Sequence, residues 1–370
     1  MMTNTQLIPW AKPQFWGNEQ SYVSEALTST WISGGPFIDR FETDFADYVN
    51  TPFALTTSNG TSAIHMAYLA LGLKPGDEVI IPGFSFLAAA NLAIQFGAKP
   101  VFAEVNPDTW LVSASEIEKC LSPKTKIIVP IHSYGNVCEM DKILTLADNH
   151  GIPVVEDTAE AFASRYNGRQ AGTMSTIGTF SFQATKTITT GEGGMVITQN
   201  EELYKVMALY RSHGMLRKIY YWHELPGHNF RLTNLQAALG CAQLKNLKYT
   251  IRERNRVYKQ YKKFLLDVHG IRPQHFSLEV EPVLWAMAVK LDRNAYPQGR
   301  DRIIEQMTHL QIETRPGFYA PSFMEFYSCP RLPVCEEISQ QVISLPTFPA
   351  LQNEQIEYIC NSLISLQCGS

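Results

Sequence analysis

The sequence lacks the features that would place a protein in a membrane or a secretory pathway. None of its apolar runs approaches the roughly 20 residues that a membrane-spanning helix needs. Residues 1–20 contain no apolar core of the kind found in a signal peptide. We therefore expect a cytoplasmic protein that does not enter the membrane.

The sequence also lacks paired cysteines and long basic runs. Its seven cysteines form no C-x-x-C pair and no Cys/His spacing typical of a metal site, so we expect reduced thiols and no bound metal. The net charge is −4, and no Lys/Arg run is long enough to indicate a nucleic-acid partner. The densest basic stretch, residues 245–263, fits a solvated helix face better than a phosphate-binding patch.

What the sequence does contain is a regular alternation of short apolar strands and helical patterns between residues 53 and 198. This alternation predicts an α/β fold with a mainly parallel sheet and helices on both faces. Such sheets bind ligands beyond the carboxyl ends of their strands. The expected strands span residues 53–57, 78–82, 100–105, 126–131, 153–156, 179–183 and 194–198, and the expected helices span 61–71, 88–96, 115–120 and 141–150.

A long helical pattern at residues 233–266 follows this region. Its apolar positions recur at helical spacing, and either Thr233 or Asn234 can cap its start. We expect this helix to bridge a large domain, residues 1–245, and a smaller C-terminal domain, residues 246–370. The smaller domain should contain a strand at 284–290 and helices at 301–310 and 353–366.

The strongest functional signal is the segment 178–198, GTFSFQATKTITTGEGGMVIT. A predicted strand leads to Ser181 and then to Lys186, and a glycine-rich turn follows that lets the backbone approach a ligand closely. A single lysine in a loop is usually a surface residue. A lysine enclosed between an apolar strand and a tight turn is instead desolvated, which lowers its pKa and makes it a nucleophile or base.

Three other segments place chemically useful residues just beyond strand ends. Asp157 can pair with a protonated pyridine nitrogen, or it can simply cap a following helix. Residues 58–62 open a helix whose free N–H groups suit a phosphate, although such residues often serve only as a cap. Phe86 can stack on a flat ring, although an aromatic at such a position is more often part of the core.

Together, these four features match the needs of pyridoxal phosphate (PLP). They supply a phosphate anchor, a stacking ring, a partner for the pyridine nitrogen and a lysine, in that order along the chain. A sheet protein without PLP would need four coincidences at strand ends. The residues therefore predict a PLP enzyme whose catalytic group is Lys186.

The sequence resembles the DegT/DnrJ/EryC1/StrS family of sugar aminotransferases over nearly its whole length. The resemblance is carried by motifs such as SNGTSAI at 58–64, VVEDTAEA at 154–161 and SFQATKTITTGEGGMV at 181–196. It implies fold type I of the PLP enzymes, with a large, mainly parallel seven-stranded sheet domain and a smaller C-terminal α/β domain. It also implies a homodimer whose active sites lie at the subunit interface.

The resemblance assigns roles to individual residues. Lys186 matches the family's Schiff-base lysine, Asp157 its pyridine-nitrogen partner and Phe86 its stacking aromatic. Asn229 matches an asparagine that reaches the cofactor phosphate of the neighbouring subunit. The other expected cofactor contacts are Gly60, Thr61, Ser62, Ser181 and Glu160, the last of which stands where many members have Gln or His.

Within the family, the motifs are most similar to the perosamine-synthase subgroup. Those enzymes aminate C4 of a nucleotide-linked 4-keto-6-deoxyhexose, with L-glutamate as the amino donor. Two alternatives remain open, namely amination of a 3-keto sugar nucleotide and a catalytically silent PLP-binding regulatory protein. The candidate sugar or diphosphate contacts are Trp31, His228, Arg231 and Arg315, each of which also fits a structural role.

Overall fold

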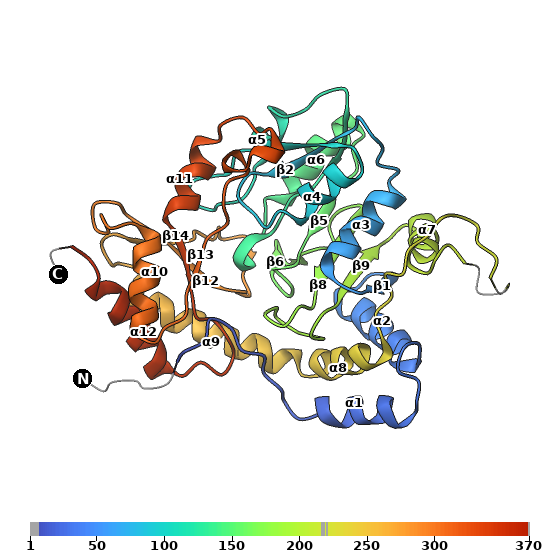
Figure 1. The fold of residues 1–370 in the computed structure, drawn as a ribbon, viewed down its shortest axis with the longest axis horizontal. Coiled ribbons are helices and arrows are strands. Elements are labelled where there is room, and N and C mark those ends of the chain that lie inside the picture. Colours follow the sequence, from blue (N-terminus) through green and yellow to red (C-terminus); the bar gives the residue numbers. More distant parts are fainter. Residues whose placement is uncertain (1–6, 216–218, 220, 369–370) are drawn as a thin grey trace.

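The computed structural model describes residues 7–215, 219 and 221–368. A large sheet with its helices forms one part of the molecule, and a smaller antiparallel sheet with its helices forms the other (Figure 1). Among the described residues, no helix is both long enough and apolar enough to cross a membrane.

In the described part of the chain, the large sheet has seven strands, as predicted. Two groups of strands, β3-β2-β4 and β5-β8-β9-β1, are joined by parallel bridges from Ile128 to Val154 and from Ile131 to Asp157. All neighbours in this order pair in parallel except those of β9, which runs antiparallel to both β8 and β1. The strands are β1 (Phe53–Thr57), β2 (Glu78–Pro82), β3 (Lys99–Ala103), β4 (Thr125–Ile128), β5 (Val155–Asp157), β8 (Ile177–Ser181) and β9 (Gly194–Thr198).

Helices cover both faces of this sheet because alternate strand residues point to opposite sides. Leu55 and Val196 pack in one core with α3 (Gly60–Ala70) and α4 (Ala88–Gln95). Their neighbours Ala54 and Ile197 pack in another core, and the helices there are α2 (Pro36–Val49) and α8 (Asn234–Lys245). The other helices around the large sheet are α1 (Glu19–Thr28), α5 (Ala114–Glu118), α6 (Met140–His150) and α7 (Glu201–Arg211).

The long helix expected at residues 233–266 is two helices, so that prediction was wrong. Of the two candidate caps, Thr233 starts α8 in a capping box with Gln236, but α8 ends at Lys245 and α9 (Leu247–Leu265) follows. At the break, Asn246 leaves helical geometry and its side-chain amide donates to the Ala242 carbonyl at 3.2 Å. Asparagine side chains compete in this way for backbone groups, which ends a helix. The break lets α8 pack on the large sheet and α9 on the small one.

The smaller sheet is antiparallel, in the order β10-β12-β14-β13. The chain's first described residues join it, because Ile8 bridges to Ile312 and the Trp10 indole donates to Ser344 Oγ at 3.0 Å. The division at residues 245 and 246 coincides with the α8–α9 break and stays a prediction. The remaining elements are β6 (Arg165–Tyr166), β7 (Arg169–Gln170), β10 (Ile271–Pro273), β11 (Val280–Glu281), β12 (Met287–Leu291), β13 (Arg315–Pro316), β14 (Val342–Leu345), α10 (Arg300–His309), α11 (Pro333–Gln341), α12 (Asn353–Ser365) and three short 3-10 turns, η1 (Ser133–Gly135), η2 (Pro321–Phe323) and η3 (Glu325–Tyr327).

Replacing Gly178 by Ala should destabilise the protein. Gly178 lies in β8, and a Cβ there would stand 1.9 Å from the Gly172 carbonyl oxygen. Backbone would have to move, so we expect the free energy of unfolding to fall by about 3 kcal/mol or more in urea denaturation. The control is Gly34→Ala, where a Cβ meets no atom within 4 Å. Equal stability of the two variants would contradict this account of β8.

Candidate functional site

A cavity of about 1060 Å³ opens at the carboxyl ends of β5 and β8. Its size suits a cofactor together with a substrate, since small-molecule sites usually occupy some 300–1,000 Å³. The structure brings most of the predicted site residues to its walls. These are Gly60, Thr61, Ser62, Phe86, Asp157, Glu160, Ser181, Lys186 and Arg315.

Lys186 reaches into this cavity with a side chain that is 14% exposed. Its Nζ lies 3.8 Å from Glu160 Oε1 and 3.9 Å from the centre of the Trp285 ring. Burial lowers the pKa of the amine, and the nearby carboxyls of Glu160 and Asp157 partly reverse that shift. A desolvated amine with a lowered pKa is the form that acts as a nucleophile or a base.

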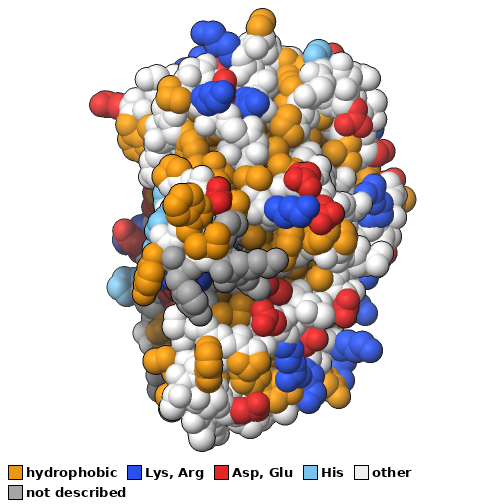
Figure 2. Space-filling view, turned by 90° about the vertical axis from the view of Figure 1, so that its right-hand side faces the viewer, with side chains coloured by type: hydrophobic (Ala, Val, Ile, Leu, Met, Phe, Trp, Pro, Cys, Tyr) orange, Lys and Arg blue, Asp and Glu red, His pale blue; other side chains and the backbone are white. Residues whose placement is uncertain are grey.

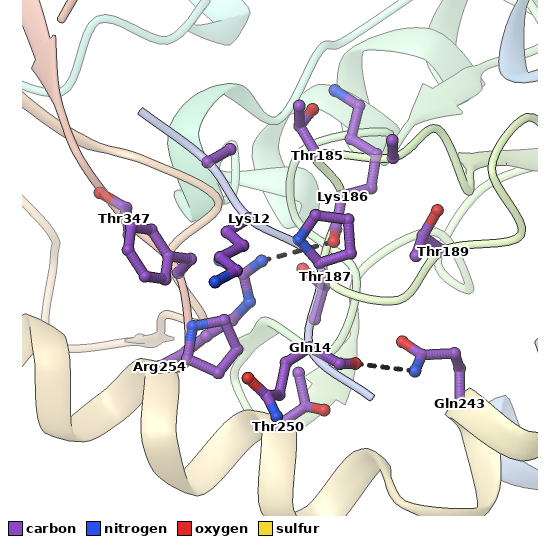
Figure 3. Close-up of a pocket in the computed structure, with 15 residues that line it drawn as sticks. Lys12, Gln14, Thr185, Lys186, Thr187, Thr189, Gln243, Thr250, Arg254 and Thr347 are labelled. Atoms are coloured by element: carbon purple, nitrogen blue, oxygen red, sulfur yellow. Dashed lines mark hydrogen bonds between the residues drawn. The ribbon is translucent and has the colours of Figure 1, made fainter. Parts of the chain in front are cut away.

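The loop that carries Lys186 is held from the C-terminal part of the chain. Arg254 of α9 donates to the Lys186 carbonyl at 3.4 Å, and the Trp285 indole N–H donates to the Thr185 carbonyl at 3.1 Å. Figure 3 shows Arg254 reaching the loop backbone while the Lys186 side chain points the other way. The loop backbone is therefore anchored to the C-terminal part of the chain, while the amine of Lys186 faces the cavity.

The two consecutive acidic residues at the end of β5 lie in different surroundings. Glu156 is fully buried and accepts from the N–H groups of Gly172, Met174 and Ser175, each at 2.8 Å, and it pairs with His132 at 3.1 Å. Asp157 lines the cavity and accepts from the Ala159 N–H at 3.0 Å. Burial raises the pKa of Asp157, while the Ala159 N–H, Lys186 and His132 lower it.

The alternative reading of Asp157 as a helix cap was wrong. Residues 158–164 form turns, and the next element is the short strand β6. Asp157 therefore has no helix to cap. Its carboxyl is buried at the cavity wall, where it is available to a ligand.

Glu160 is the second acid beside Lys186. Its Oε2 accepts from the Tyr134 backbone N–H at 3.0 Å, while its Oε1 faces the lysine. Burial raises the pKa of Glu160 to about 7, against the opposing influence of Lys186 and the Tyr134 N–H. Glu160 can therefore hold or release a proton near neutral pH.

The start of α3 forms a place for an anion. Asn59 caps the helix by accepting from the Ser62 N–H at 2.8 Å, and no partner for the N–H groups of Gly60 or Thr61 is found among the described residues. Gly60 lies so close to Ser181 that a Cβ would approach the Ser181 Cβ to 2.9 Å. Free N–H groups at a helix start and a hydroxyl beside them suit a phosphate.

Phe86 is 62% exposed at the cavity wall, so its ring face is available for stacking. The cavity thus contains a phosphate cradle, an aromatic face, a buried acid and a desolvated lysine. These residues fit PLP, whose phosphate, ring, pyridine nitrogen and aldehyde need these four partners.

Four predicted residues do not line this cavity. Asn229 Oδ1 accepts from Arg231 Nε at 3.0 Å, and His228 stacks on Phe230 with ring centres 4.6 Å apart. Trp31 lies between α1 and α2 with an exposed indole. Of the predicted substrate contacts, only Arg315 lies at the cavity.

Other residues at the cavity had no signal in the sequence. Trp285 and Phe318 come from the C-terminal part of the chain, and Tyr134 lies in a turn beyond β4. Nothing in their local sequence distinguishes them from core aromatics. Tyr134 stacks on both Trp285 and Phe318, with ring centres 6.0 and 5.2 Å apart, so packing across the chain brings them together.

Comparison with known proteins identifies close relatives across the whole chain. A model of the DegT/DnrJ/EryC1/StrS aminotransferase family matches residues 14–364. GDP-perosamine synthase of Escherichia coli O157:H7 is 40% identical over 96% of this chain and 97% of its own length. GDP-perosamine synthase of Caulobacter vibrioides is 38% identical over 98% and 99%, respectively.

Solved structures of aminotransferases share the fold. Helicobacter pylori PseC, an aminotransferase involved in the biosynthesis of pseudoaminic acid, superposes with a TM-score of 0.93 at 27% identity and covers 98% of this chain and 99% of its own. The aminotransferase TlmJ of Streptoalloteichus hindustanus superposes with a TM-score of 0.92 at 28% identity, with 97% and 98% covered. The fold class predicted from the sequence is confirmed.

Replacing Glu160 by Gln should change how stability depends on pH. The pKa of Glu160 is about 7 in the folded protein, against an ordinary value of 4.5. The stability that this raised pKa contributes is therefore fully present below pH 4.5 and is lost as the pH rises through 7. Between about pH 5 and pH 8, the free energy of unfolding of cofactor-free Glu160→Gln should therefore rise by about 1–3 kcal/mol relative to that of the wild type. Urea denaturation at the two pH values measures this gain.

The control for this experiment is Glu139→Gln, which removes an exposed carboxyl that pairs with Lys142. The free energy of unfolding of this variant should differ from that of the wild type by the same amount at both pH values. A Glu160→Gln difference that is also independent of pH would contradict the raised pKa.

Proposed function

The chain belongs to the DegT/DnrJ/EryC1/StrS aminotransferase family, and we propose that it transfers the amino group of L-glutamate to C4 of a nucleotide-linked 4-keto-6-deoxyhexose. The coarser activity, that of a PLP-dependent sugar aminotransferase, follows from membership and from the full-length relatives. The finer one is supported by three GDP-perosamine synthases that are 35–40% identical over at least 96% of this chain. Their names also favour GDP as the nucleotide.

The cavity supports a specific set of cofactor contacts. The N–H groups of Gly60 and Thr61 and the Ser181 hydroxyl would bind the phosphate, and Phe86 would stack on the ring. Asp157 would pair with the pyridine nitrogen and keep it protonated. When bound, PLP supplies a carbonyl that takes up amines and a ring that withdraws electrons from the carbon next to them.

Lys186 performs the proton transfers in this proposal. In the first half of the reaction, its Nζ removes the proton from Cα of the amino donor. In the second half, it returns a proton to the sugar carbon that receives the amine. Because burial lowers the pKa of Lys186, more of the amine is unprotonated at neutral pH and able to accept the first proton.

Arg315 supplies a positive charge at the cavity wall. Its guanidinium pairs with Glu313 and lies 5.9 Å from the Trp10 ring centre. A guanidinium binds a carboxylate or a phosphate through paired N–H groups. We assign it to the negatively charged part of a substrate, either a glutamate carboxylate or the sugar diphosphate.

The second part of the proposal is a homodimer with shared sites. Asn229, Arg231 and His228 lie outside their own chain's cavity, on the segment that follows α7. Figure 2 shows hydrophobic side chains exposed among charged ones on the α7 side of the molecule. Tyr221 and Trp222, on the same segment, are 88% and 56% exposed. Large apolar side chains that are exposed together mark surfaces that bind a partner, which supports a second copy here.

The position of the new amine tests the proposed reaction. Protein loaded with PLP should convert L-glutamate and a GDP-linked 4-keto-6-deoxyhexose to 2-oxoglutarate and a sugar with nitrogen on C4, as followed by NMR. A 3-keto sugar nucleotide, offered in parallel, should remain unchanged. Nitrogen on C3 would support the 3-amination alternative, and binding of PLP without amination of either sugar would support the silent regulatory one.

Mixed dimers test the shared site. Lys186→Ala and Asn229→Ala should each abolish most turnover. Mixed after unfolding and refolding, they should recover about a quarter of wild-type activity, because half of the dimers are then mixed and each has one intact site of two. The control mixes Lys186→Ala with Glu160→Gln. Both residues lie in the same chain's cavity, so no mixed dimer contains an unsubstituted site. Activity that stays at the level of the separate variants would contradict a site completed by the partner's Asn229.

A further inference from the structure

The amine of Lys186 rests against the face of an indole ring. Lys186 Nζ lies 3.9 Å from the centre of the Trp285 ring, about as close as it lies to Glu160 Oε1. We propose that Trp285 is a positioning residue that holds the free amine of Lys186 at the reaction centre. This inference rests on the role proposed above for Lys186.

Trp285 is itself fixed on several sides. Its indole N–H donates to the Thr185 carbonyl, next to Lys186, and its own carbonyl accepts from Arg254 at 3.3 Å. Its ring stacks on Tyr134 with an angle of 23° between planes and meets Trp10 edge to face at 5.3 Å. The same Arg254 holds the Lys186 carbonyl. Ring and loop are therefore tied to one another, and the ring keeps a constant place relative to the amine.

An aromatic face suits this task because it attracts an ammonium group without accepting its proton. A carboxylate attracts the ammonium too, but it can take the proton and so compete with the substrate carbon. Lys186 has neighbours of both kinds. The carboxyls of Glu160 and Asp157 stabilise its charged form, which Arg254 disfavours, and the Trp285 ring centre lies 3.9 Å from its Nζ. The Trp285 ring therefore holds the ammonium group of Lys186 in place and leaves its proton available for transfer.

Three replacements distinguish the effect of the aromatic ring face from the effect of the indole N–H. Trp285→Phe, Trp285→Leu and Trp285→Met all lose the bond to Thr185, but only Phe keeps an aromatic face. We expect kcat of Trp285→Phe to stay within about threefold of the wild type, and kcat of the Leu and Met variants to fall about ten- to a hundredfold. KM for the sugar nucleotide should change less than about threefold in all three, because Trp285 acts through Lys186.

A second measurement needs neither cofactor nor turnover. Acylation of Lys186 by dilute acetic anhydride in the cofactor-free protein, followed by peptide mass analysis across pH, gives the midpoint at which the amine loses its proton. Because the ring stabilises the ammonium form, this midpoint should lie about half to one pH unit lower in Trp285→Leu than in Trp285→Phe. This result stands even if the sugar substrate proposed above is wrong.

The matched control is Trp16→Leu. Trp16 also donates its indole N–H, to Thr250 Oγ1 at 2.9 Å, but it does not line the cavity. Its kcat and its Lys186 midpoint should equal those of the wild type. Equal effects of Phe, Leu and Met at position 285 would overturn the proposal, and so would loss of folding in both aliphatic variants while the Phe variant folds and works.

Discussion

The site depends on placing an amine and two carboxyls together away from water. Each of these groups loses hydration on burial, which disfavours its charged form, and each recovers part of that loss from the opposite charges beside it. Lys186 therefore has a lowered pKa, while Asp157 and Glu160 have raised ones. With a pKa of about 7, Glu160 can exchange a proton at neutral pH beside Lys186, which distinguishes this cavity from a structural ion pair on the surface.

The end of β5 shows how the fold meets this constraint. Side chains alternate along a strand, so Glu156 and Asp157 point to opposite faces. Glu156 accepts hydrogen bonds from three backbone N–H groups and pairs with His132, and these bonds tie the loop at residues 172–175 to the strand. Among the described residues, the Asp157 carboxyl accepts a hydrogen bond only from the Ala159 N–H, so it remains available in the cavity. One acid thus stabilises the scaffold, and the other is left free to bind.

Much of the site could be predicted because its parts are local. The strand ends before Asp157 and Ser181 and the helix start at Gly60 follow from apolar runs and a capping residue a few positions apart. The contributions of Tyr134, Trp285 and Arg254 could not be predicted, because packing between distant segments brings them to Lys186. The break at Asn246 was missed for a similar reason, since a side chain bonding back to Ala242 leaves the apolar spacing unchanged.

The lysine loop also explains why the C-terminal part of the chain belongs to the chemistry. A loop rich in glycine and threonine has little apolar surface with which to fix its own position. Arg254 from α9 and Trp285 from just before β12 supply that restraint through the carbonyls of Thr185 and Lys186. Any movement of the small sheet against the large one would move the wall that faces the amine. The two sheets must therefore keep a defined arrangement for Lys186 to meet Glu160 and Asp157.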